Sequence, residues 1–137
     1  MDVDETEIVV NCKKGDSDVF RMLAILRSFD QKLTGTKEGH TFILDATDVL
    51  YCDSVDKKTF IYTIDGVYET PLRLYELEDR LASGDFFRAS KQNIINLSKI
   101  VSLRPEISGR IEVTLQSRER LFVSRQYVPV LKSKLGL

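Results

Sequence analysis

Catalysis would need a nucleophile, a general base or a metal site, and this sequence offers few residues for any of them. His40 is the only histidine, and it lies at an expected boundary between segments, which is a poor support for a Ser-His-Asp or Cys-His arrangement. Cys12 and Cys52 form no CxxC motif and are interpreted as reduced, structural thiols. No GxxxxGKS/T, GxGxxG or HExxH motif occurs. We therefore expect no enzyme, no metal and no cofactor.

The formal net charge of -1 conceals two halves of opposite sign. Residues 1–83 carry 17 acidic and 10 basic residues, whereas residues 84–137 carry 4 acidic and 10 basic residues. The C-terminal half can supply a cationic surface, which suits phosphate binding but is equally expected of an ordinary solvated face. The acidic N-terminus lacks the basic segment of a signal peptide, which predicts a cytoplasmic protein.

Short strands dominate the secondary structure expected after residue 39. Alternating apolar residues predict strands at 41–44, 49–52, 59–64, 67–69, 100–103, 111–115 and 121–123. The strands at 59–64 and 67–69 are expected to meet as a hairpin across Asp65-Gly66. A helix capped by Thr70 and ended by Ser83-Gly84, and a last helix at about 128–135, complete the pattern. It predicts a mainly β, antiparallel fold with short helices.

The first forty residues are expected to form a strand-helix extension. A strand at 7–12 precedes a helix whose apolar stripe suits a core or a dimer contact; the stripe comprises Val19, Met22, Leu23, Leu26 and Phe29. Residues 34–39, with two glycines among polar residues, are interpreted as a linker. The predicted division is an extension of residues 1–39 followed by a domain of residues 40–137.

Two motifs are more specific than these patterns. The first is Phe86-Phe87-Arg88-Ala89-Ser90-Lys91-Gln92-Asn93-Ile94-Ile95-Asn96, and the second is Val123-Ser124-Arg125-Gln126-Tyr127. Their content and order resemble the signatures of the LytTR family of DNA-binding domains, over about residues 41–137. The best match is to short, stand-alone bacterial members with a small N-terminal αβ extension. The resemblance implies an elongated antiparallel β fold and a sequence-specific transcription regulator that binds double-stranded promoter repeats.

Family members approach DNA with loops, and the resemblance implies three such loops here: the first between Asp53 and Thr59, the second at residues 90–93, and the third at Arg125 and Gln126 after the last strand. The expected DNA-binding residues are Lys57, Lys58, Arg88, Ser90, Lys91, Gln92, Asn93, Arg125 and Gln126. Cations neutralise phosphates, whereas Arg, Gln and Asn can pair with base edges. Arg88 suits two roles equally: a phosphate contact, or an ion pair with a carboxylate of the helix expected between Thr70 and Ser83. Asn96 is interpreted as structural. Many members have a histidine where this chain has Ser90, which alters the contact chemistry.

Kinship also implies how such a protein is controlled. The extension is too short for a phosphoacceptor domain, so regulation by abundance or by a partner, in many relatives a membrane protein, is expected. A homodimer is a further expected partner, and no small-molecule substrate is expected. The alternative function is a protein-interaction module that uses a sheet edge and does not bind DNA.

Overall fold

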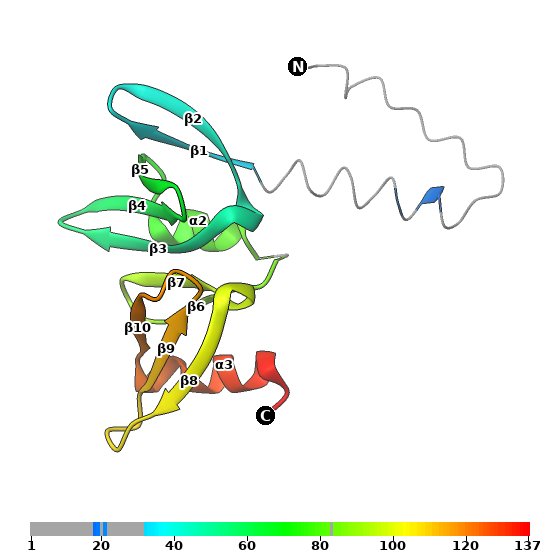
Figure 1. Cartoon of the computed structure of the whole chain (residues 1–137), viewed down its shortest axis with the longest axis vertical. Coiled ribbons are helices and arrows are strands. Elements are labelled where there is room, and N and C mark those ends of the chain that lie inside the picture. Colours follow the sequence, from blue (N-terminus) through cyan, green and yellow to red (C-terminus); the bar gives the residue numbers. More distant parts are fainter. Residues whose placement is uncertain (1–17, 20, 22–31, 83) are drawn as a thin grey trace. The chain divides into compact units, whose positions relative to one another are not determined.

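The computed structural model describes residues 18, 19, 21, 32–82 and 84–137, in two compact units, residues 1–31 and 32–137. In the first unit, Asp18, Val19 and Arg21 are helical, with Val19 half-buried and the other two exposed. The predicted strand at 7–12 and the remainder of the predicted apolar stripe lie outside the described residues. The second unit has the mainly β, antiparallel fold that the sequence predicts (Figure 1).

Seven antiparallel strands form the larger sheet, in the order β2-β1-β5-β4-β3-β7-β6. Their bounds are β1 Lys32–Lys37, β2 His40–Asp45, β3 Val49–Val55, β4 Lys58–Thr63, β5 Gly66–Thr70, β6 Phe86–Arg88 and β7 Asn93–Asn96. Between β5 and β6 the chain forms helix α2, Leu74–Arg80. Two 3-10 turns, η2 Ala46–Asp48 and η3 Leu97–Lys99, introduce β3 and β8.

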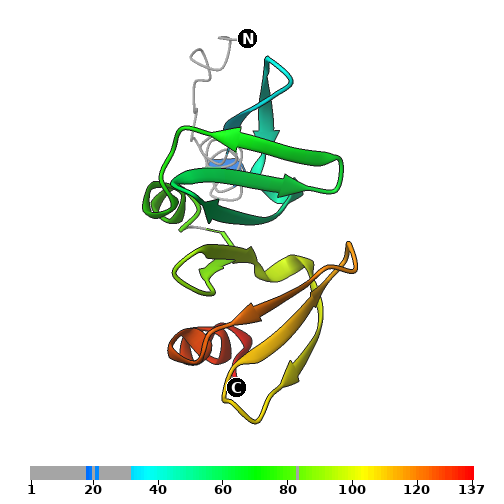
Figure 2. The same cartoon turned by 90° about the vertical axis from the view of Figure 1, so that its left-hand side faces the viewer.

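A second sheet of three strands, in the order β10-β9-β8, follows in the sequence. Its strands are β8 Ile100–Pro105, β9 Ile111–Leu115 and β10 Arg120–Val123. The chain then passes through the 3-10 turn η4, Arg125–Tyr127, into the last helix α3, Val128–Leu135. In Figures 1 and 2, α2 lies beside the larger sheet and α3 beside the smaller one.

Adjacent residues on the central strands face two different cores. Phe86 and Ile94 pack with the leucines of α2, whereas their neighbours Phe87 and Ile95 pack with β9, β10 and α3. A strand that is buried on both faces carries consecutive apolar residues instead of alternating ones. The pairs in the first motif therefore place β6 and β7, together with β3, between the two cores.

The predicted linker at residues 34–39 is wrong, because most of that segment belongs to strand β1. Leu33 and Gly35 are buried on one face of the strand, and Glu38 and Gly39 form the turn to β2 with φ of 53° and 81°. A Cβ at Gly35 would lie 2.6 Å from the Tyr68 Cβ, so the strand needs glycine for close packing at this point. The glycines thus reflect a crowded strand and a tight turn.

Two predicted boundaries also shift. Thr63 pairs with Gly66, so the β4–β5 turn consists of Ile64 and Asp65, one residue earlier than predicted. Thr70 ends β5 and does not cap the following helix; α2 begins at Leu74, where the Glu76 carboxylate accepts a hydrogen bond from the Arg73 N–H at 2.7 Å. No helix in the described part of the chain is long and apolar enough to cross a membrane.

Candidate nucleic-acid interface

The first predicted loop is a two-residue turn between β3 and β4. Val55 pairs with Lys58, which leaves only Asp56 and Lys57 in the turn, with φ of 53° and 68°. Positive φ at both positions matches the right-handed twist of a hairpin, but it strains a residue such as lysine. The turn presents Lys57 and Lys58, both exposed, at the end of the hairpin.

The second predicted loop, between β6 and β7, is held by its own side chains. The Ser90 Oγ donates to Asn93 Oδ1 at 2.7 Å and accepts from the Gln92 N–H at 3.1 Å. The Asn93 amide donates in turn to Asp53 Oδ1 at 3.0 Å. Ser90 and Asn93 are therefore occupied in shaping the loop, while Lys91 and Gln92 remain exposed.

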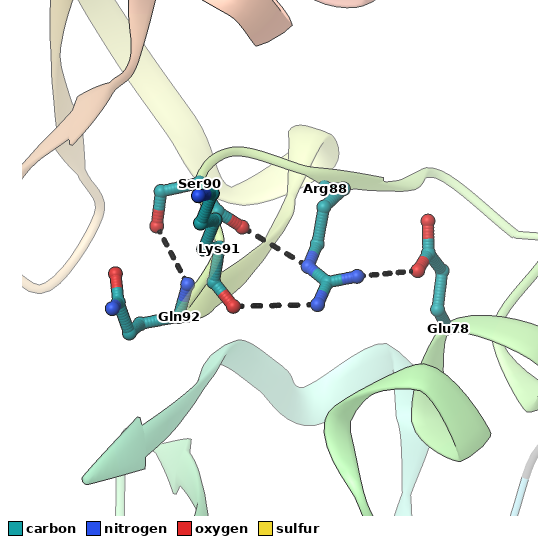
Figure 3. Close-up of polar contacts among 5 residues, drawn as sticks. All are labelled: Glu78, Arg88, Ser90, Lys91 and Gln92. Carbon is teal, nitrogen blue, oxygen red and sulfur yellow. Dashed lines mark hydrogen bonds and ion pairs between the residues drawn. The ribbon is translucent and has the colours of Figure 1, made fainter.

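The Arg88 side chain also holds this loop, through hydrogen bonds to its backbone (Figure 3). Its guanidinium donates to the Ser90 carbonyl at 3.0 Å and to the Lys91 carbonyl at 3.3 Å, and it forms an ion pair of 2.7 Å with Glu78 of α2. The planar guanidinium suits this role because its donors point in fixed, divergent directions. Of the two roles that the sequence leaves open for Arg88, the structure displays the pairing with a helix carboxylate.

Hydrogen bonds link all three predicted loops. The Ser54 N–H, at the end of β3, donates to the Gln92 carbonyl at 2.9 Å. On the other side of the loop, Ser124 donates to the Ala89 carbonyl from its N–H at 2.9 Å and from its Oγ at 3.1 Å. Ser124 directly precedes Arg125 and Gln126. The β3–β4 hairpin, the β6–β7 loop and the η4 turn therefore form one continuous edge, which faces the viewer in Figure 2.

Arg125 extends across the backbone of another hairpin. Gly109, in the β8–β9 turn, has φ of 97°, and a Cβ built on it would lie 2.7 Å from the Arg125 Cδ. The bare glycine thus leaves room for the arginine stem. Arg125 and Gln126 are exposed, and within the described residues Arg125 forms no ion pair. Glu119, the acidic residue before β10, accepts a hydrogen bond from the Tyr51 hydroxyl at 2.9 Å.

Burial raises the pKa of the Asp53 carboxyl, although the Ser54 N–H partly opposes the shift. Burial also raises the pKa of Tyr51, and the carboxylate of Glu119 adds to that shift. Both groups lie on β3, and Asp53 contacts the β6–β7 loop through Asn93. The buried Cys52 thiol, whose pKa burial raises to about 12, is structural as predicted.

The geometry divides the predicted residues into two sets. Those that project from the edge are Lys57, Lys58, Lys91, Gln92, Arg125 and Gln126, and those that shape it are Arg88, Ser90 and Asn93. Sequence reasoning missed the supporting roles of Glu78, Asp53, Ser124 and Gly109. Only Glu78 left a signal, as a carboxylate on the helix expected to pair with Arg88. The structural interpretation of Asn96 is confirmed: it is buried, donates to the Val49 carbonyl at 2.8 Å and accepts from the Ser98 N–H.

Known proteins resemble this chain in sequence and in fold. The family model described as the LytTr DNA-binding domain matches residues 39–136. A relative from Staphylococcus aureus strain NCTC 8325, named an uncharacterized HTH-type transcriptional regulator, is 28% identical over 135 residues, covering 97% of this chain and 91% of that protein. Its counterpart in strain MW2 is 27% identical over the same length and coverage. A solved LytTr DNA-binding domain from Bacillus cereus superimposes with a TM-score of 0.74 at 22% identity, covering 78% of this chain and 98% of that one.

The mainly β fold and the match of the family model define a DNA-binding domain. The chain belongs to the LytTR family of DNA-binding domains. This confirms the resemblance carried by the two sequence motifs. The family match begins at residue 39, whereas the compact structural unit begins at Lys32, so strand β1, which lies between β2 and β5 in the sheet, precedes the matched residues.

Proposed function

We propose that the chain is a sequence-specific transcription regulator that reads duplex DNA with the edge formed by its three linked loops. The observation that carries this proposal is the hydrogen bonding of Ser54 and Ser124 to the β6–β7 loop, because it holds three separate sequence segments in one fixed arrangement. A fixed arrangement of donors lowers the entropy lost on binding. The names of the Staphylococcus aureus relatives, which call them transcriptional regulators, support the same role.

Lys57, Lys58 and Lys91 are assigned to the phosphates. Each is exposed and, among the described residues, forms no ion pair. A lysine ammonium is a mobile point charge, which suits a phosphate whatever the neighbouring base. Releasing counterions at several such contacts makes affinity fall steeply with salt.

Gln92, Arg125 and Gln126 are assigned to base edges. Arg125 follows a strand end that is anchored through Ser124, so the backbone that carries its side chain is held in place. Its two parallel donors match guanine N7 and O6 in the major groove. Arg88, Ser90 and Asn93 act as positioning residues, and they affect binding by fixing the backbone that carries Lys91 and Gln92.

The experiment is a selection of bound sequences from random duplexes, followed by titrations of the best site at several salt concentrations. Arg125→Ala should weaken the best site by about 1–3 kcal/mol and flatten the preference at one base position. Lys91→Ala should weaken matched and mismatched duplexes alike and reduce the salt slope by about one. The two variants therefore fail in different ways.

Thermal unfolding of each variant separates contact from fold. If Arg125→Ala keeps its discrimination and loses stability, the arginine belongs to the fold and the base-reading role is wrong. If affinity of the wild type changes by less than about threefold between about 50 and 200 mM salt, phosphate contacts do not dominate. A protein that shifts no duplex would favour the alternative sheet-edge interaction module.

The proposed regulator carries out no catalysis, needs no cofactor and acts in the cytoplasm on paired or directly repeated half-sites. Pairing of half-sites requires either two bound copies or a homodimer, and control by a membrane-protein partner follows the same proposal. Sedimentation with and without a two-repeat duplex measures the number of copies. It distinguishes a dimer formed in solution from one assembled on DNA.

A further inference from the structure

A separate pocket lies behind the interface, where β6 passes between α2 and the C-terminal segment. Its volume is about 280 Å³. Phe86, Phe87 and Ile94, all buried residues of the shared central strands, contribute to its lining. Tyr127 and Val130 line it as well, and Val130 is 42% exposed, so apolar surface remains open to solvent. None of the residues predicted to project toward DNA lines this pocket.

Three charged residues contribute to the lining: Glu78, Arg88 and Lys134. Glu78 and Arg88 neutralise each other in the ion pair of 2.7 Å. Lys134 forms no ion pair within the described residues and carries the one uncompensated charge of the pocket. An apolar cavity with a single unpaired ammonium is complementary to a small anion that has an apolar body.

We propose that this pocket binds a small amphipathic carboxylate, with its hydrocarbon part against Phe86 and Val130 and its carboxylate on Lys134. The volume lies slightly below the usual range for ligand sites, so a short aliphatic or single-ring acid fits and a large cofactor does not. With few buried contacts and one exposed ion pair, affinity for such a ligand is about millimolar.

The pocket is physically connected to the DNA-facing edge. Arg88 lines it and also holds the Ser90 and Lys91 carbonyls, while Tyr127 lines it and belongs to the same η4 turn as Arg125. A ligand that fills the pocket therefore stabilises the arrangement in which both loops are in place. Because coupling is reciprocal, the ligand raises affinity for DNA and DNA raises affinity for the ligand. This coupling, unlike the pocket itself, rests on the proposed function.

Octanoate is a suitable probe, and the first measurement uses the full chain without DNA. Methyl NMR should show saturable shifts at Val130 and Ile94 as octanoate is added. Lys134→Gln should weaken binding by about three- to fivefold, the contribution of one exposed ion pair, whereas Lys132→Gln on the same helix should not change it. Shifts spread over the whole chain, no saturation, or equal losses in both variants would overturn the proposal.

A second variant tests the apolar part and the rival occupant. Val130→Asp should abolish octanoate binding, and Val101→Asp, which changes an exposed valine of β8, should preserve it. Sedimentation of both variants checks whether a second copy covers the pocket. If Val130→Asp splits a dimer while octanoate never binds to the wild type, the occupant is a second copy and the carboxylate site is wrong.

The coupling is then measured by titrating DNA with and without octanoate, against sodium acetate at equal ionic strength. Octanoate should tighten DNA binding by the wild type, and the effect should diminish in Lys134→Gln. Octanoate binding without any effect on DNA would overturn the coupling and leave the pocket assignment standing. A wild type that binds no duplex would instead contradict the proposed function, independently of the ligand result.

Discussion

The β6–β7 loop and the β3–β4 turn lie together at the proposed interface, but different kinds of hydrogen bond stabilise them. The loop is fixed by side chains: Ser90 bonds to Asn93, and Asn93 bonds to Asp53. Arg88 bonds to the Lys91 carbonyl and to Glu78. The turn is fixed by backbone pairing alone, at the expense of positive φ at Asp56 and Lys57. In the loop, polar residues mostly determine shape, whereas in the turn they are free to contact a ligand.

Replacing Arg88 tests how the β6–β7 loop is held, and it should have the largest effect on stability and DNA binding. Arg88→Ala removes two hydrogen bonds to loop carbonyls and leaves Glu78 without its partner. We expect a loss of about 1–3 kcal/mol in stability and weaker binding to every duplex with an unchanged salt slope. Arg88→Lys should rescue only partly, because a lysine cannot span the three acceptors.

Arg104→Ala is the matched control for this experiment, since Arg104 also pairs with a carboxylate, Glu112, but is 71% exposed. It should change stability by less than about 1 kcal/mol. If Arg88→Ala keeps its stability and loses about one unit of salt slope, Arg88 contacts a phosphate directly and the positioning role is wrong.

The third segment, η4, follows Ser124, which bonds to the β6–β7 loop through both its backbone and its side chain. Substitution of Gly109 tests what positions Arg125 in this segment. Gly109→Ala should displace the Arg125 stem, because the new Cβ would meet Cδ at 2.7 Å. Gly39→Ala places alanine at a similar positive φ with nothing within 4 Å. Both variants should lose about 1 kcal/mol of stability from backbone strain. Only Gly109→Ala should reduce discrimination between matched and mismatched duplexes; equal discrimination in the two variants would show that Gly109 does not position Arg125.

In the β3–β4 turn, a substitution of Lys57 should change protein stability and DNA affinity in opposite directions. Lys57→Gly relieves a positive φ of 68° and should raise the free energy of unfolding by about 0.5–1 kcal/mol. The same change removes a cation, so the salt slope should fall by about one. Arg118→Gly relieves a comparable φ of 78° in the β9–β10 turn and provides the stability reference. A salt slope unchanged in Lys57→Gly would remove this turn from the interface.

Asp53 connects the two regions, and its charge should have the smallest effect. Because its folded pKa is raised above 3.8, the folded state retains a proton that the unfolded state has lost, and stability falls as pH rises through that window. Asp53→Asn keeps an acceptor for the Asn93 amide and should therefore be more stable than the wild type at pH 7. Chemical denaturation across pH should show this difference vanishing below the ordinary carboxyl range. A constant difference at all pH values would exclude the charge as its cause.

Sequence patterns predicted the regular elements where local signals and burial agree. The bounds of β9 and α3 match because Ile111, Val113 and Leu115 alternate into the core, and because a proline near the start suits a helix from Val128. The patterns failed where tertiary packing overrides local composition. At Gly35 a glycine that signals a linker is required by the neighbouring Tyr68.

The candidate site was predictable in its location but only partly in its roles. Residue types indicated which segments are cationic and polar, and the family motifs gave their order. Whether Ser90 and Asn93 face solvent or each other depends on Asp53, which lies 40 positions earlier than Asn93. Such long-range hydrogen bonds leave no periodic signal in a single sequence.

The burial of β3 and β7 on both faces has a consequence for the timescales of the molecule. Their shared backbone hydrogen bonds can exchange with solvent only when both adjoining cores open. The amides of Cys52 and Ile94, which face each other across β3 and β7, should therefore be among the slowest to exchange, while those of Lys57 and Lys91 exchange rapidly. The proposed DNA-facing segments thus have solvent-accessible amides at their tips, whereas the strands that carry them open only when the whole domain unfolds.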